Sequence, residues 1–146
     1  MRLTALAFTV ALLAPLTAAA DEDSVPPVTD PLVKKECGEC HMAFQPAFLP
    51  AASWRKIMVT LDNHFGEDAS LDAGTRDKVE SYLVANAGRS RIDSANSPLR
   101  ITNLNWFRKE HREGEVKRLR KKHNVKTLAD CAACHRGADR GYFEDD

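Results

Sequence analysis

The chain has 146 residues, 43% of them hydrophobic, and a formal net charge of zero at neutral pH. A chain without excess positive charge has no general attraction for nucleic acid or for an anionic membrane, so neither is expected as a partner. The length fits one small soluble domain or two half-sized lobes.

The first twenty residues have the pattern of a secretory signal. Arg2 is followed by the apolar run "LTALAFTVALLAPL" and then by small residues at Ala18 and Ala20. Cleavage after Ala20 is therefore expected, which leaves a mature chain over 21–146. A retained anchor is disfavoured because the run is short for a span of ~20 residues and Pro15 interrupts it. The sequence predicts a periplasmic protein with no integral membrane segment after cleavage.

All the cysteines of the chain lie in two C-x-x-C-H blocks, "CGECH" and "CAACH". Exported proteins usually form disulfides, and two C-x-x-C blocks could instead hold one zinc ion. Neither alternative explains why a histidine directly follows each second cysteine. Covalent haem does, because two thiols add to the haem vinyl groups and the next residue ligates iron. We therefore predict two haem c groups, attached through Cys37, Cys40, Cys131 and Cys134, with His41 and His135 as the proximal iron ligands.

Each iron then has a second axial position to fill. The candidates are His64, His111, His123, Met42 and Met58. No methionine follows Met58, so histidine/methionine ligation from its own half is not expected for the second haem. Met42 is a poor candidate, because it is tethered directly to His41 on the wrong side of the ring.

His64 is the favoured distal ligand in the first half. The run "SWRKIMVTLDNHFGED" has apolar residues at helical spacing, and His64 lies seven residues after Ile57 on the same stripe. Such a histidine is ordinarily part of a core, but a nearby iron that needs a ligand favours ligation. Met58 borders the same face and is the alternative.

His111 is the favoured distal ligand in the second half. Phe107 precedes it by four residues, which puts both on one face of a short helix. A surface histidine in a charged helix is the alternative. His123 lies among cations in "KRLRKKHNV" and is typical of a solvated face. The short connection that follows the first block favours His64 as a ligand of the first haem. Crossed ligation, in which each half supplies a ligand to the other's iron, stays open.

The remaining chain is predicted to be a mostly α scaffold of two lobes around the haems. The expected order is a signal peptide over 1–20, a flexible leader over 21–31, an N-terminal haem lobe over 32–88, a connector over 89–98 and a C-terminal haem lobe over 99–146. A short helix should lead into the first block. A second helix is expected over 72–87, with Val79, Tyr82 and Leu83 facing inward. Between them, "FQPAFLPAA" is expected to be a loop whose Phe44, Phe48 and Leu49 can cover a haem face.

Several segments together resemble the bacterial dihaem cytochrome c family, DHC. They are "ECGECHMAFQPAFLPAASW", "HFGEDASLD", "YLVANA", "ITNLNWFRKEH" and "CAACHRGADRGYF". The resemblance spans nearly all of the mature chain and implies bis-histidine ligation of both irons, by His41, His64, His111 and His135. It also implies an electron donor to an oxygen-binding one-haem cytochrome c, itself supplied by a membrane cytochrome b. Gly114 stands where relatives would have an apolar residue, and His123 matches no motif of the family.

Coordination of this kind predicts an electron carrier and not an enzyme, because an iron with two histidine ligands has no position for a substrate. A monomer is expected. Two other functions stay open. The chain could be the electron-entry small subunit of a periplasmic reductase, or a dihaem peroxidase with one open iron. The basic run over 117–122 is the candidate docking surface for a redox partner.

Overall fold

The computed structural model describes residues 24–89 and 98–144. The predicted signal peptide over 1–20 and nearly all of the predicted connector lie outside this part. The α-helices are α1 (Pro31–Gly38), α2 (Ala51–Met58), α3 (Ala73–Ala85), α4 (Asn105–Glu110) and α5 (Glu113–His123). Short 3-10 turns are η1 (Pro46–Phe48), η2 (Leu61–Asn63), η4 (Ile101–Asn103), η5 (Cys131–Ala133) and η6 (Ala138–Arg140). Within these residues no strand forms beyond isolated bridges, so the mostly α prediction is confirmed.

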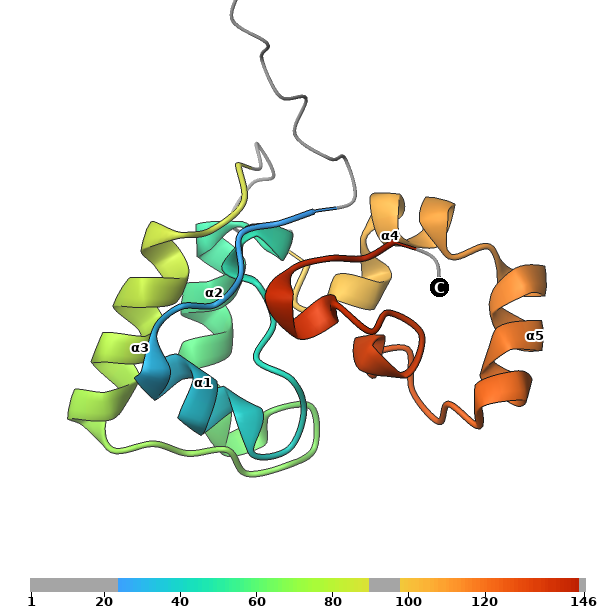
Figure 1. The fold of residues 1–146 in the computed structure, drawn as a ribbon. Coiled ribbons are helices and arrows are strands. Elements are labelled where there is room, and N and C mark those ends of the chain that lie inside the picture. Colours follow the sequence, from blue (N-terminus) through green and yellow to red (C-terminus); the bar gives the residue numbers. More distant parts are fainter. Residues whose placement is uncertain (1–23, 90–97, 145–146) are drawn as a thin grey trace, which may run out of the picture.

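The helices lie in two groups (Figure 1). The first contains α1, α2 and α3, with α2 packed along α3. The second contains α4 and α5, and α5 lies at the edge of the molecule opposite α3. The C-terminal segment passes between the two groups. No helix in the described ranges is both long enough and apolar enough to cross a bilayer.

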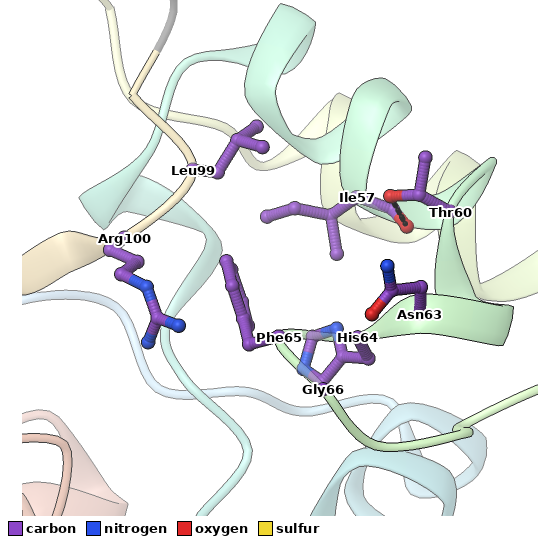
Figure 2. A pocket seen from close by; sticks show the side chains of 8 residues that line it. All are labelled: Ile57, Thr60, Asn63, His64, Phe65, Gly66, Leu99 and Arg100. Carbon is purple, nitrogen blue, oxygen red and sulfur yellow. Dashed lines mark hydrogen bonds between the residues drawn. The ribbon is translucent and has the colours of Figure 1, made fainter.

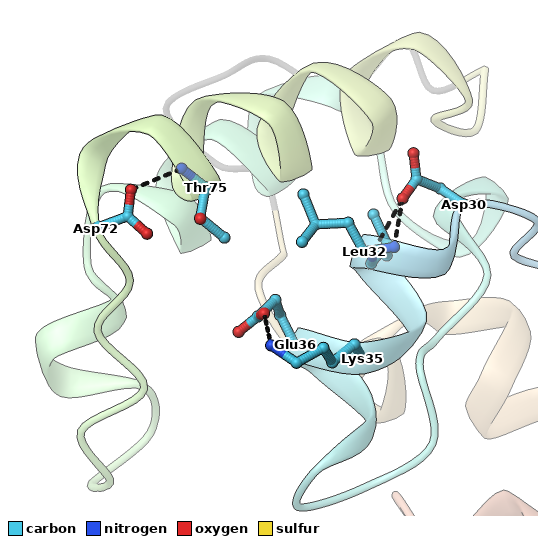
Figure 3. A network of polar contacts seen from close by, with 7 residues as sticks. Asp30, Leu32, Lys35, Glu36, Asp72 and Thr75 are labelled. Carbon is cyan, nitrogen blue, oxygen red and sulfur yellow. Dashed lines mark hydrogen bonds and ion pairs between the residues drawn. The ribbon is translucent and has the colours of Figure 1, made fainter.

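Aspartate caps fix the starts of α1 and α3 (Figure 3). The Asp30 carboxylate accepts hydrogen bonds from the backbone N–H groups of Leu32 and Val33, at 2.8 and 3.1 Å. The Asp72 carboxylate accepts one from Thr75 at 3.0 Å. Such caps satisfy N–H groups that have no partner inside the helix. Both predicted helices are therefore confirmed, although α3 starts one residue later and ends two residues earlier than expected.

One hydrophobic core joins both halves of the chain. Val79 and Leu83 of α3 are 0% and 2% exposed, as the sequence predicted, while Tyr82 is half-buried. The other core residues are Val28, Val33, Leu49, Trp54, Ile57, Met58, Leu104 and Phe107. Since Leu104 and Phe107 come from the second half, α4 is anchored on the first helical group.

The leader is packed where the structure describes it, unlike the flexible segment expected over 21–31. The Val25 N–H donates to the carbonyl oxygen of Gly141 at 2.8 Å, and Val28 is buried. Gly141 has a φ of 87°, and a Cβ atom there would collide with the Val25 carbonyl oxygen. Only glycine suits such a position. The start of the described chain is thus held against its end.

The helix predicted to carry His64 stops early. α2 ends at Met58, and the Thr60 hydroxyl donates to the Lys56 carbonyl oxygen at 2.9 Å. Hydroxyl bonds to carbonyls of the preceding turn compete with the backbone ladder, and β-branched residues such as Val59 and Thr60 weaken helices. The prediction that His64 belongs to a continuous helical stripe was wrong. His64 follows the η2 turn instead.

Candidate functional site

The first C-x-x-C-H block begins on α1 and ends in a turn. Cys37 lies in the last turn of α1 and packs against the core, while Cys40 is exposed. His41 Nδ1 lies 2.7 Å from the Met42 carbonyl oxygen, and its ring stacks on Phe44 at 4.7 Å. A carbonyl oxygen only accepts, so Nδ1 carries the proton and Nε2 is available to a metal.

His64 faces His41. The centroids of the two imidazole rings are 6.2 Å apart and their planes differ by 27°. Two imidazoles that bind one metal ion from opposite sides have centroids roughly 6 Å apart, because each metal–nitrogen bond is about 2.0–2.1 Å and each ring adds about 1 Å. The separation of His41 and His64 therefore fits a single metal ion between them.

The second block repeats this arrangement with different elements. η5 carries Cys131, and the His135 N–H donates to the Cys131 carbonyl oxygen at 2.8 Å. His135 Nδ1 lies 3.2 Å from the Glu144 carbonyl oxygen. The ring centroids of His135 and His111 are 6.0 Å apart, with planes at 81°.

His111 ends α4, and its ring is held by the helix that carries it. Its Nδ1 lies 2.9 Å from the Phe107 carbonyl oxygen, and the two rings stack at 3.9 Å with an interplanar angle of 7°. The shared face that the sequence predicted for Phe107 and His111 is confirmed. Hydrogen bonding at Nδ1 fixes the tautomer and leaves Nε2 available to a metal.

Each predicted distal histidine lies opposite the proximal histidine of its own half. This placement favours ligation within each half over the crossed arrangement. Met58 is 3% exposed within the hydrophobic core, and His123 is exposed at the end of α5. Met42 contacts His41 through its backbone carbonyl.

The four cysteines form no disulfide in the described part of the chain. Burial raises the pKa of the Cys37 and Cys131 thiols to about 11, and the charges of Glu36 and Asp130 add to the effect. The described ranges include every cysteine and histidine of the chain, and no group of three or more potential metal-ligating side chains forms there. The two blocks are thus not assembled into a joint zinc site.

A pocket of about 290 Å³ lies beside His64 (Figure 2). Its walls come from the α2–η2 region and from Leu99 and Arg100, which follow the connector. The Arg100 guanidinium carbon lies 4.0 Å from the centroid of the Phe65 ring. Burial, together with the charges of His41 and Arg100, lowers the pKa of His64. No pattern in the sequence pointed to Arg100, because its position near His64 depends on a contact between distant segments.

Phe48 links the two halves instead of lying alone in a loop. Its ring is 5.6 Å from Trp106 and 5.2 Å from Phe143, and Phe143 is 5.7 Å from His135. Of the three side chains proposed to cover a haem, Phe44 contacts His41 and Leu49 lies in the core.

The residues of both sites fit covalent haem. Each site has two thiols and a histidine in the attachment spacing, and a second imidazole at a distance that suits one metal ion between the rings. Backbone carbonyl oxygens of other residues accept hydrogen bonds from Nδ1 of His41, His111 and His135, and thereby hold three of the four imidazole rings.

Comparison with known proteins gives the same result. The sequence matches the dihaem cytochrome c family, DHC, over residues 33–143. A diheme cytochrome c from Rhodobacter sphaeroides is 47% identical, with a TM-score of 0.73, over 82% of this chain and 100% of that one. A crystal structure of DHC purified from Rhodobacter sphaeroides is 51% identical, with a TM-score of 0.69, over 80% and 99%. A diheme cytochrome type c from Shewanella baltica is 35% identical, with a TM-score of 0.67, over 78% and 86%.

No match was found among curated proteins. The match to the family covers most of the chain, and the solved relatives share its fold. The chain therefore belongs to the dihaem cytochrome c family, and it binds two haem c groups, as the sequence predicted.

Proposed function

We propose that this protein carries single electrons through two haems whose irons each have two histidine ligands. The first iron would be held by His41 and His64, and the second by His135 and His111. The observation that carries the proposal is the spacing of the two imidazole pairs, 6.2 and 6.0 Å between centroids. Electron transfer itself is the function that membership of the family supports.

The haem supplies one-electron iron chemistry, and the chain determines what else can happen there. The thiols would hold each ring in place. Hydrogen bonds from imidazole Nδ1 to backbone carbonyls orient the ligands and increase their basicity. A second histidine on each iron occupies the position that oxygen or peroxide would need, which favours a carrier over an enzyme.

The location and the partners follow as further parts of the proposal. An N-terminal secretory pattern and covalent haem favour the periplasm. Family resemblance favours a membrane cytochrome b as donor and an oxygen-binding one-haem cytochrome c as acceptor. A role as the electron-entry subunit of a larger reductase is the second candidate, because it needs the same two sites.

The surface of α5 is the proposed docking surface. Its exposed cations include Lys117, Lys121 and Lys122, and none of the three forms an ion pair within the described residues. Arg120 is used locally, since its guanidinium donates to the carbonyl oxygens of Val125 and Lys126. Like charges one helical turn apart, as at Lys117 and Lys121, destabilise a helix slightly. Such a cluster suits an acidic face on the partner.

Magnetic resonance and ligand binding on the purified dihaem protein test the proposal. We expect two low-spin ferric signals, and no rapid binding of carbon monoxide to either ferrous haem at neutral pH. A high-spin signal from one haem, with rapid carbon monoxide binding and peroxidase turnover, would show that one iron is open and would support the peroxidase alternative.

A further inference from the structure

The pocket beside His64 contains a cation that neither the haem-attachment motif nor the ligand pairs account for. Arg100 reaches the first haem site from beyond the connector and stacks on Phe65 at 4.0 Å. The Phe65 ring in turn lies 4.8 Å from the ring of His64. Figure 2 shows Phe65 between the side chains of Arg100 and His64.

The backbone positions Phe65 for this contact. Its φ is 59°, a conformation that bulky residues rarely adopt, and Gly66 follows with a φ of 110°. Hydrogen bonds between the backbones of His64 and Glu67, at 2.7 and 3.3 Å, close the turn around it. The turn thus holds the Phe65 ring against both His64 and Arg100.

The guanidinium of Arg100 is arranged to bind an anion. Stacking on an aromatic face engages the plane of the guanidinium, and its N–H groups, which lie in that plane, can still donate to a carboxylate. Among the described residues no carboxylate forms an ion pair with Arg100. The pocket also has polar walls from Thr60 and Asn63, and its volume of about 290 Å³ is ample for a carboxylate.

We propose that Arg100 binds a propionate carboxylate of the haem attached at Cys37 and Cys40, and that this positive charge raises the reduction potential of that haem. A haem propionate is the favoured anion because it is tethered to the group that His41 and His64 would hold, which gives it a high effective concentration. A nearby cation disfavours the ferric state, which carries one more positive charge than the ferrous state. The inference rests on the proposed function, because it assumes an iron between His41 and His64.

Resolved redox titrations of both haems in Arg100→Gln and Arg100→Lys proteins test it. We expect Arg100→Gln to lower one of the two potentials, with a change in that couple's equilibrium constant of at least about threefold, or about 28 mV at 59 mV per tenfold for one electron. Arg100→Lys should retain most of the effect, because the charge remains. Phe65→Leu should lower the same potential by less, and its effect should not add to that of Arg100→Gln.

Lys78→Gln is the matched control, because it removes an exposed positive charge from α3. An equal shift in Lys78→Gln and Arg100→Gln, equal shifts of both haems, or no shift would overturn the inference. Added phosphate or chloride should leave the wild-type potentials unchanged. A shift that these anions cause in the wild type but not in Arg100→Gln would show that a free anion binds in the pocket, and it would also overturn the inference. If the inference fails while every variant keeps low-spin spectra, the proposed function still stands. Failure of the proposed function would instead be seen as a high-spin signal in the wild type.

Discussion

Gln45 Nε2 donates a hydrogen bond of 2.6 Å to the carbonyl oxygen of Ala138, across 93 residues of chain. Both residues are 0% exposed. Gln45 lies four residues after His41, and Ala138 lies three residues after His135, so this one bond connects the segments that follow the two haem-attachment blocks. Together with the contacts of Phe48, it adds to the shared core in holding the two sites relative to each other.

Replacing Gln45 should therefore weaken the joint between the halves. Gln45→Ala removes this bond, while the carbonyl oxygen of Ala138 still accepts from the Gly141 N–H, so we expect the free energy of unfolding to fall by about 0.5–1.5 kcal/mol. Denaturant unfolding of the dihaem protein measures this. Lys78→Gln, at an exposed position, should change stability by less than about 0.5 kcal/mol. Equal stability of Gln45→Ala and wild type would show that the joint does not depend on this bond.

Removing the distal histidines should open the irons separately. We expect His64→Ala and His111→Ala each to turn one haem high-spin and to bind about one carbon monoxide per molecule, because each removes one axial ligand. The double variant should bind about two. His123→Ala is the control, since His123 is exposed at the end of α5, and it should keep both low-spin signals. Loss of a low-spin signal in His123→Ala would contradict the assignment of ligands.

Charge reversal on α5 should slow reaction with anions. The α5 variant carries the substitutions Lys117→Glu, Lys121→Glu and Lys122→Glu. The control set carries Lys34→Glu, Lys56→Glu and Lys78→Glu, and all six positions are exposed. Stopped-flow oxidation of the reduced protein by ferricyanide, an anionic probe, should become about tenfold slower at low ionic strength in the α5 variant.

The dependence of this rate on salt should also become weaker, because screening acts on an attraction that has been removed. The control set changes the net charge equally and should have a smaller effect. Equal slowing by both sets would show that net charge, and not the surface of α5, governs the reaction.

The cap of α3 should contribute to stability only when Asp72 is ionised. The hydrogen bond from Thr75 lowers the pKa of Asp72, so the folded state favours the carboxylate. The contribution is present above the unfolded pKa of about 3.9 and is lost as the pH falls through the lower folded value. In urea unfolding, Asp72→Ala should be less stable than wild type at pH 7, and the difference should shrink below about pH 3.9. A difference that stays constant with pH would mean that the charge has no part in the cap.

The parts of the fold that depend on neighbouring residues were predictable. α3 has a capping aspartate, inward apolar residues at helical spacing and a glycine beyond its end, and it forms almost where expected. The pairing of Phe107 with His111 needed only a separation of four residues on one helix.

The approach of His64 to His41 was expected for an incorrect reason. The apolar periodicity suggested one long helix, but α2 ends at Met58 and a 3-10 turn redirects the chain. The leader differs for another reason, since its prolines and acids gave no sign that Val25 would bond to Gly141, far away in the sequence. The end of α2, in contrast, involves a local bond from Thr60 to Lys56.

By itself, the sequence determined the covalent chemistry. Two thiols and a histidine within five residues were sufficient to predict haem attachment and a proximal ligand for each iron, because that spacing is the geometry of the reaction. Only the tertiary structure decided which histidine faces which, and brought Arg100 to the first site and Gln45 to Ala138. These contacts join segments that are separated in the sequence, so no local pattern predicts them. They form because burial of the shared core fixes both halves against each other.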